Sequence, residues 1–173
     1  RLLGFHMERL QASAEYFNFS FHKEKTFRKL KSYREQLPKE TPSKVRLLLC
    51  ADGTVTLESQ VLTEKSQTSK ILLSDEKTSS KDRFLYHKTT RRELYEKEFA
   101  RVSELGYADV VFRNERGEVT EGAISNIFIE KDGELYTPPV ECGVLPGVFR
   151  RHILETDAKA SERILLTDDL AHA

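Results

Sequence analysis

The sequence lacks the features that mark membrane, nucleic-acid-binding and disulfide-stabilised proteins. No apolar run approaches the roughly 18 residues that a membrane-spanning helix needs, and the N-terminus shows no signal-peptide pattern. Lys plus Arg and Asp plus Glu both total 28, which argues against a protein that binds nucleic acid by neutralising phosphates. The two cysteines, Cys50 and Cys142, lack metal-ligand spacing, so we expect buried free thiols and no metal site. These absences favour a cytoplasmic protein without a membrane or nucleic-acid partner.

What is present is enough apolar sequence for a sizeable core. The chain has 173 residues, 38% of them hydrophobic, which suits one large domain or two small lobes. It starts at Arg1 rather than Met and ends at Ala173, just inside an apparent new helix. We therefore expect a segment of a longer protein, lacking pieces at both ends.

The first part of the sequence predicts a small α+β lobe over residues 1–66. Residues 6–14 and 23–36 have helical periodicity, and the second helix would bury Phe27 and Leu30. Residues 44–51 and 54–59 read as strands, and the Asp52-Gly53 pair between them indicates a hairpin.

Residues 67–173 predict a larger, strand-rich lobe in which helices alternate with strands. Residues 70–74 predict a short strand, and polar, Ser-rich sequence surrounds it, so we interpret residues 63–83 as the junction between the lobes. Helices are predicted at 91–105 and 148–155, and strands at 108–113, 118–121, 125–130, 134–137 and 163–167.

Lys88 is the first candidate for chemistry. A lysine attacks a carbonyl or removes a proton only when it is neutral, and burial or a neighbouring cation favours that state. An aromatic-apolar run, residues 84–86, precedes it, and Arg91 and Arg92 follow it. An ordinary surface lysine at the end of a strand remains the alternative.

Three further features have a functional and an ordinary interpretation. Glu121, followed by Gly122, could bind a protonated ring nitrogen, or it could be a solvated acid in a turn. The backbone N–H groups of Val148 and Phe149 open a predicted helix and could bind a phosphate, or could simply begin a helix. Arg9 could bind a phosphate or carboxylate, or could be a solvated residue of a charged helix.

Taken together and in order, these features carry a family resemblance. The chain resembles the class IV, fold-type IV pyridoxal-phosphate enzymes, which include branched-chain and D-amino-acid aminotransferases and aminodeoxychorismate lyases. The matching segments are His6-x-x-Arg9-Leu10-x-x-Ser13-Ala14, His87-Lys88-Thr89, Glu121-Gly-x-x-Ser-Asn126-x-Phe128 and Leu145-Pro-Gly-Val-x-Arg150. The resemblance implies a two-lobed α+β fold, here truncated at both ends, and pyridoxal 5'-phosphate as the cofactor.

The resemblance also implies a role for each candidate. Lys88 would form the Schiff base with the cofactor and shuttle the proton, and Glu121 would bind the pyridine nitrogen. Arg9 would bind the phosphate together with the backbone N–H groups of Val148 and Phe149. The family usually has Thr where this chain has Phe149, so a backbone contact would survive and a hydroxyl contact would not.

The run Lys88-Thr-Thr-Arg-Arg92 resembles aminodeoxychorismate lyases, especially those fused behind the chorismate-amination component of para-aminobenzoate synthases. Such a lyase releases pyruvate and leaves para-aminobenzoate, a step of folate biosynthesis; by charge alone, Arg91 or Arg92 could receive a substrate carboxylate. The alternatives are an aminotransferase acting on D- or branched-chain amino acids, and a cofactor-free remnant. The resemblance further implies a homodimer, a possible upstream chorismate-amination domain, and family segments at both ends without which we expect weak cofactor binding.

Overall fold

The computed structural model describes residues 2–62 and 69–171 of the chain. They fall into two compact units, one comprising Leu3–Gln67 and the other chiefly Thr68–Ala173. The predicted lobe boundary, between residues 66 and 67, lies outside the described residues. Within the described ranges, no helix is both long and apolar enough to cross a membrane.

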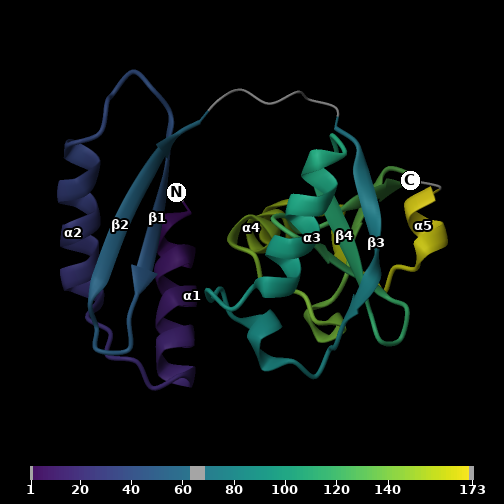
Figure 1. Cartoon of the computed structure of the whole chain (residues 1–173), viewed down its shortest axis with the longest axis horizontal. Helices are drawn as coiled ribbons and strands as arrows, with labels where there is room; N and C mark the ends of the chain where they lie inside the picture. The colour runs from purple at the N-terminus through teal and green to yellow at the C-terminus, as the bar shows by residue number, and fades with distance from the viewer. Residues whose placement is uncertain (1, 63–68, 172–173) are drawn as a thin grey trace. The chain divides into compact units, whose positions relative to one another are not determined.

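The first unit contains two helices and one hairpin (Figure 1). Its elements are α1 (Leu3–Tyr16), α2 (Lys23–Glu35), β1 (Ser43–Leu49) and β2 (Val55–Val61). The strands pair antiparallel from Ser43 opposite Val61 to Leu49 opposite Val55, which confirms the predicted hairpin. Its turn is stabilised by Asp52, whose carboxylate accepts the Thr54 N–H at 2.8 Å.

Two burial predictions in this unit were wrong. Phe27 is 48% exposed, and Thr26 beside it is buried. The reason is that α2 presents a polar face to β2: Lys29 donates to the Val55 carbonyl, and the Tyr33 hydroxyl contacts Ser59 Oγ at 3.1 Å. Cys50 is exposed rather than buried; it directly follows β1 at the turn of the hairpin, where its N–H donates to the Thr54 carbonyl at 2.9 Å.

The second unit is organised around β4 (Figure 1). Its first elements are β3 (Ile71–Thr78), the 3-10 turn η1 (Arg83–Tyr86), α3 (Glu93–Glu104), β4 (Asp109–Asn114) and β5 (Val119–Gly122). β3 pairs parallel with β4 after the α3 crossover, and β4 pairs antiparallel with β5. β4 therefore lies between two strands, and its side chains alternate between two buried faces.

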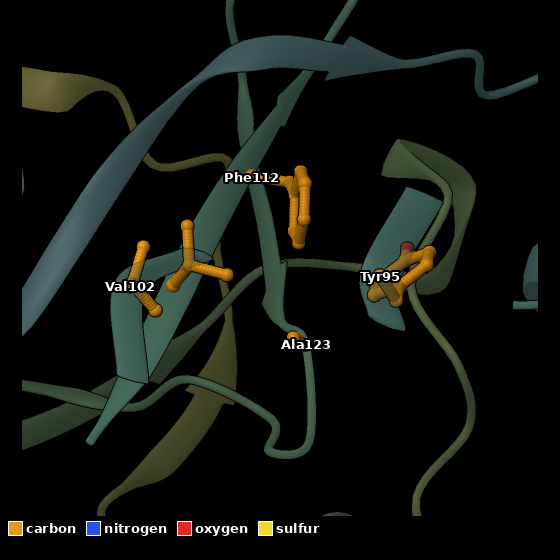
Figure 2. Packing of buried hydrophobic residues seen from close by; sticks show 5 residues of the cluster. Tyr95, Val102, Phe112 and Ala123 are labelled. Carbon is orange, nitrogen blue, oxygen red and sulfur yellow. The ribbon is translucent and has the colours of Figure 1, made fainter. Parts of the chain in front are cut away.

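Each face of β4 has its own apolar cluster. Figure 2 shows the cluster on the α3 side, where Phe112 of β4 lies near Tyr95 of α3; their ring centroids are 4.8 Å apart. The other members of this cluster are Val102, Val110 and Ala123. The opposite cluster comprises Val111, Val119, Ile129 and Leu165. This double burial fixes β4, and hence the position of β5 beside it.

The remaining elements form a second small sheet. They are β6 (Ile129–Lys131), β7 (Glu134–Thr137), the 3-10 turn η2 (Val140–Cys142), α4 (Val148–Thr156), β8 (Ala160–Glu162) and α5 (Thr167–Ala171). β7 pairs antiparallel with β6 and parallel with β8, which follows the α4 crossover. Asp132 and Gly133, between β6 and β7, both have positive φ (55° and 78°), as the two-residue turn of a tight hairpin requires.

Three segment predictions in this unit need correction. Residues 75–78, assigned to the junction, continue β3, because the polar side chains of this strand are satisfied: Ser74 donates to Glu98 of α3 at 2.8 Å. The last strand covers residues 160–162 rather than 163–167, and Leu165 instead enters the core. Residues 125–128 form a loop before β6, in which Asn126 faces the site described below.

Candidate active site

Glu121 on β5 is the centre of the candidate site. It is only 5% exposed, and its carboxylate accepts three hydrogen bonds. Oε1 accepts the Tyr95 hydroxyl at 3.2 Å, and Oε2 accepts the Leu145 N–H at 3.1 Å and the Asn126 amide at 3.3 Å. The three donors come from α3, from the loop before α4 and from the loop after β5, so tertiary structure orients this acid.

Burial raises the pKa of Glu121 to about 7. The hydrogen bonds from Leu145 and Tyr95 oppose that rise, as do the positive charges of Lys88 and Arg92. The pKa of Tyr95 is raised in turn, first by burial and then by the neighbouring Glu121 charge. Glu121 therefore changes charge near neutral pH, where an approaching cation would favour its ionised form.

Lys88 lies in the loop between η1 and α3, and it is exposed. The aromatic run before it does not bury it. Its positive charge nevertheless acts on Glu121, so the second unit brings together the predicted lysine and the predicted acid. An exposed amine close to a buried acid is open to a small molecule that contacts both.

The two arginines after Lys88 are held differently. Arg92 is half-buried, donates to the Ala123 carbonyl, and lies over the Tyr95 ring with its guanidinium carbon 4.8 Å from the centroid. It ties the Lys88 loop to the segment that follows Glu121. Arg91 is exposed and lies over the Phe84 ring at 4.3 Å. Arg91 is therefore the better candidate for a substrate carboxylate.

The start of α4 has the character of an anion site. The N-cap residue is Gly147, which has no side chain to cap the first N–H groups, and the positive end of the helix dipole lies there. The first two helical residues are Val148, which is buried, and Phe149, which is 63% exposed. The predicted phosphate-binding N–H groups thus begin a helix whose first turn carries no acidic residue.

Gly122 is explained by close packing rather than by a ligand. A Cβ at this position would lie 2.3 Å from Asp109 Oδ2 and 2.5 Å from Ser125 Oγ. Those two atoms are hydrogen-bonded at 2.6 Å, and the contact fixes the turn after β5. Of the three residues that donate to Glu121, Asn126 and Leu145 belong to motifs quoted from the sequence, but neither was given a role there, and Tyr95 was also missed as a site residue.

Arg9 lies on α1 of the first unit and is half-buried. Its charge, after burial, contributes to a lowered pKa of His6. Its assignment to a cofactor phosphate stays a prediction.

The residues of the second unit fit pyridoxal phosphate. This cofactor needs an amine for its aldehyde, an acid for its ring nitrogen and an anion site for its phosphate. Lys88, Glu121 and the start of α4 have those properties, and the buried Glu121 carboxylate could accept a charge-assisted hydrogen bond from a pyridinium N–H. Among the described residues, no group of three His, Cys, Asp or Glu side chains could hold a metal ion.

Comparison with known proteins agrees with this chemistry. The family model "Amino-transferase class IV" matches residues 1–173. A Schizosaccharomyces pombe protein named "Putative aminodeoxychorismate lyase" is 29% identical over 89% of this chain and 68% of its own length. Branched-chain-amino-acid aminotransferases also match, over shorter segments; the chain covers 17% to 22% of those relatives.

Solved structures match the fold. A crystal structure named "Putative amino-acid aminotransferase" from Mesorhizobium loti has a TM-score of 0.89 and 32% identity, covering 99% of this chain and 83% of its own. The PLP-bound form of "A hypothetical aminotransferase from Mycobacterium tuberculosis" has a TM-score of 0.78 at 19% identity, covering 96% and 67%. These matches confirm the predicted α+β fold. The chain belongs to the class IV aminotransferase family, the fold-type IV enzymes that normally depend on pyridoxal phosphate.

Proposed function

We propose that this chain is the catalytic part of a pyridoxal-phosphate-dependent aminodeoxychorismate lyase, which releases pyruvate and leaves para-aminobenzoate. The observation that supports the proposal is the exposed Lys88 amine whose charge acts on Glu121, an acid with a pKa raised to about 7 by burial. The choice of the lyase rests on the Lys88–Arg92 segment and on the similarity to the S. pombe protein.

When bound, pyridoxal phosphate supplies an electron sink next to the carbon that loses its proton. Glu121 keeps the ring nitrogen protonated by accepting its hydrogen bond, and Tyr95 and Leu145 hold the carboxylate in place. The Lys88 amine takes the proton from the substrate carbon that bears the nitrogen. The bond between the adjacent ring carbon and its ether oxygen would then break, and the enolpyruvate that leaves would take up a proton to become pyruvate. Aromatisation of the substrate ring would drive the step forward.

Other residues of the chain position the ligands. The N–H groups of Val148 and Phe149 would bind the cofactor phosphate, and the family resemblance assigns a phosphate contact to Arg9 of the first unit. Arg91 receives a carboxylate of the substrate, because it is exposed and follows Lys88 closely. Arg92 stays on the Ala123 carbonyl and the Tyr95 ring, and so keeps the Lys88 loop against the Glu121 strand.

The test combines chemical trapping with product analysis. The protein is loaded with pyridoxal phosphate, reduced with borohydride and digested, and mass spectrometry locates the pyridoxyl group. We expect it on Lys88, and we expect Lys88→Ala to abolish both the adduct and the production of para-aminobenzoate and pyruvate from aminodeoxychorismate. Lys81→Ala, which removes an exposed lysine seven positions earlier, is the control and should behave as wild type. An adduct on another lysine would refute the site.

A second function uses the same residues. The similarity to the M. loti aminotransferase structure favours amino transfer to a keto acid, with Lys88 moving the proton between two carbons. Incubation with an amino donor and a keto acid separates the two functions. Amino transfer without pyruvate release from aminodeoxychorismate would replace the lyase with an aminotransferase acting on D- or branched-chain amino acids.

We also propose that the protein is a homodimer, as the family resemblance implies. Light scattering coupled to size-exclusion chromatography tests this, and a monomer at micromolar concentration would contradict it. The possible upstream chorismate-amination domain is tested by the sequence of the natural polypeptide on both sides of this segment.

A further inference from the structure

We propose that Asn126 is a positioning residue that fixes the distance between Glu121, the proposed acid for the ring nitrogen, and the start of α4, the proposed phosphate site. This inference rests on the proposed use of pyridoxal phosphate. It concerns a side chain to which the predicted chemistry assigns no role.

The Asn126 amide lies between the two ends of the candidate cofactor site. Its Nδ2 donates to Glu121 Oε2 at 3.3 Å and to the Leu145 carbonyl at 3.0 Å. The Leu145 N–H donates to the same Glu121 oxygen at 3.1 Å. Glu121, Asn126 and Leu145 are therefore each hydrogen-bonded to the other two. The acid is joined to the loop before α4 both directly and through the Asn126 amide.

The other end of the same amide faces the N-cap of α4. A Cβ added to Gly147 would lie 1.8 Å from Asn126 Oδ1, far inside van der Waals contact, so the amide occupies the space of a side chain at residue 147. Gly147 is buried and has φ −65° and ψ 141°, which any residue can adopt. The glycine is thus needed for the approach of Asn126 and not for its backbone angles.

This geometry matters for a ligand with two anchored ends. The distance between a pyridine nitrogen and a phosphate on the same molecule is set by covalent bonds, so both protein anchors must stay in register to bind it. An alanine at residue 126 would leave Glu121 with two donors, and it would leave the loop before α4 held to the acid by the Leu145 N–H alone. An aspartate would lose the amide donor and place a second carboxylate beside Glu121, which disfavours ionisation of both.

The experiment compares two ligands on matched variants. Dissociation constants of pyridoxal phosphate and of pyridoxal, which lacks the phosphate, are measured by absorbance on wild type, Asn126→Ala, Asn126→Asp and Ser125→Ala. Loss of one buried hydrogen-bonding side chain corresponds to about tenfold in affinity. We expect Asn126→Ala to weaken pyridoxal phosphate by about tenfold or more and pyridoxal by much less, because pyridoxal does not need the helix start.

Ser125→Ala is the control, because it removes the neighbouring bond to Asp109 Oδ2 and leaves Glu121 and Leu145 untouched. It should keep the wild-type ratio between the two ligands. Asn126→Asp should bind pyridoxal phosphate weakly above pH 7 and recover as the pH falls, a response that a general packing defect would not give.

The outcomes separate the inference from the function on which it rests. If wild type binds no pyridoxal phosphate, the proposed function fails. If wild type binds and Asn126→Ala keeps the wild-type ratio, the positioning role of Asn126 is overturned. If Asn126→Ala does not fold, Asn126→Asp decides the matter, and a pH-independent affinity for that variant overturns the inference.

Discussion

Replacing Glu121 with glutamine tests whether burial sets the charge of this acid. The raised pKa of about 7, against an ordinary 4.5, means that the folded protein holds the Glu121 proton more tightly than the unfolded chain does. Between these two pH values the unfolded state binds fewer protons, so raising the pH lowers the free energy of unfolding. The full cost of ionising Glu121 is about 3 kcal/mol, since each pKa unit corresponds to about 1.4 kcal/mol.

Glutamine keeps the shape of the side chain and does not titrate. Its amide oxygen can accept from Leu145 and Asn126, and its NH₂ can donate to the Tyr95 hydroxyl. We therefore expect the free energy of unfolding of Glu121→Gln, relative to wild type, to increase by about 2–3 kcal/mol between about pH 5 and about pH 8.5. Urea unfolding of the cofactor-free proteins, followed by circular dichroism at several pH values, measures this difference.

Glu118→Gln supplies a control of opposite sign. The Arg116 guanidinium, which donates to Glu118 at 2.6 Å, holds the pKa of that carboxyl down at about 2. Its ionised form stabilises the fold, and this contribution is lost as the pH falls from 4.5 toward 2. Glu118→Gln should thus be less stable than wild type at neutral pH. Parallel pH profiles for wild type and Glu121→Gln would refute the reasoning about Glu121.

Four further substitutions test other parts of the site. Phe149→Thr places a hydroxyl at the start of α4, and we expect several-fold tighter binding of pyridoxal phosphate with unchanged binding of pyridoxal, measured by titration of the cofactor-free protein; equal gains for both ligands would contradict a phosphate contact. Arg92→Ala should lower kcat, and it should lower the free energy of unfolding by about 1 kcal/mol, because the Lys88 loop loses its contact with the Ala123 carbonyl. Arg91→Ala should raise KM and leave the free energy of unfolding within about 0.5 kcal/mol of wild type. Gly122→Ala should cost about 1–3 kcal/mol of stability through its clash with Asp109, and an unchanged urea midpoint would show that the turn can shift.

The sequence predicts those elements in which apolar periodicity and turn residues agree. The helix at 93–104 and both hairpins at Asp-Gly pairs are confirmed. The end of β3 was missed because its residues are polar and are satisfied by tertiary contacts, such as Ser74 with Glu98. The final strand was misplaced because its apolar run, residues 164–166, places Leu165 in the core outside any strand.

The candidate site divides in the same way. Lys88 and Glu121 could be proposed from the sequence because an amine and an acid are the groups that the cofactor chemistry needs, and both stand in a family motif. The Leu145 N–H could not, because every residue except proline has one, and only the fold aims this one at Glu121. Arg91 and Arg92 looked alike in the sequence, and they separate only because the Ala123 carbonyl lies within reach of one of them.

The energetics of Glu121 bear on whether the chain is an enzyme or a remnant that keeps only the fold. A buried acid that ionises near pH 7 contributes nothing to the stability of the cofactor-free chain above that pH, and it costs up to about 3 kcal/mol. A protonated ring nitrogen would remove that cost by pairing with the carboxylate. The free energy that ionised Glu121 takes from the stability of the cofactor-free chain would then add to the affinity for the cofactor. Tyr95, Asn126 and the Leu145 N–H are all donors aimed at the ionised form. Such an arrangement favours a cofactor site over an inherited structural contact, because a purely structural role would be served better by a neutral side chain.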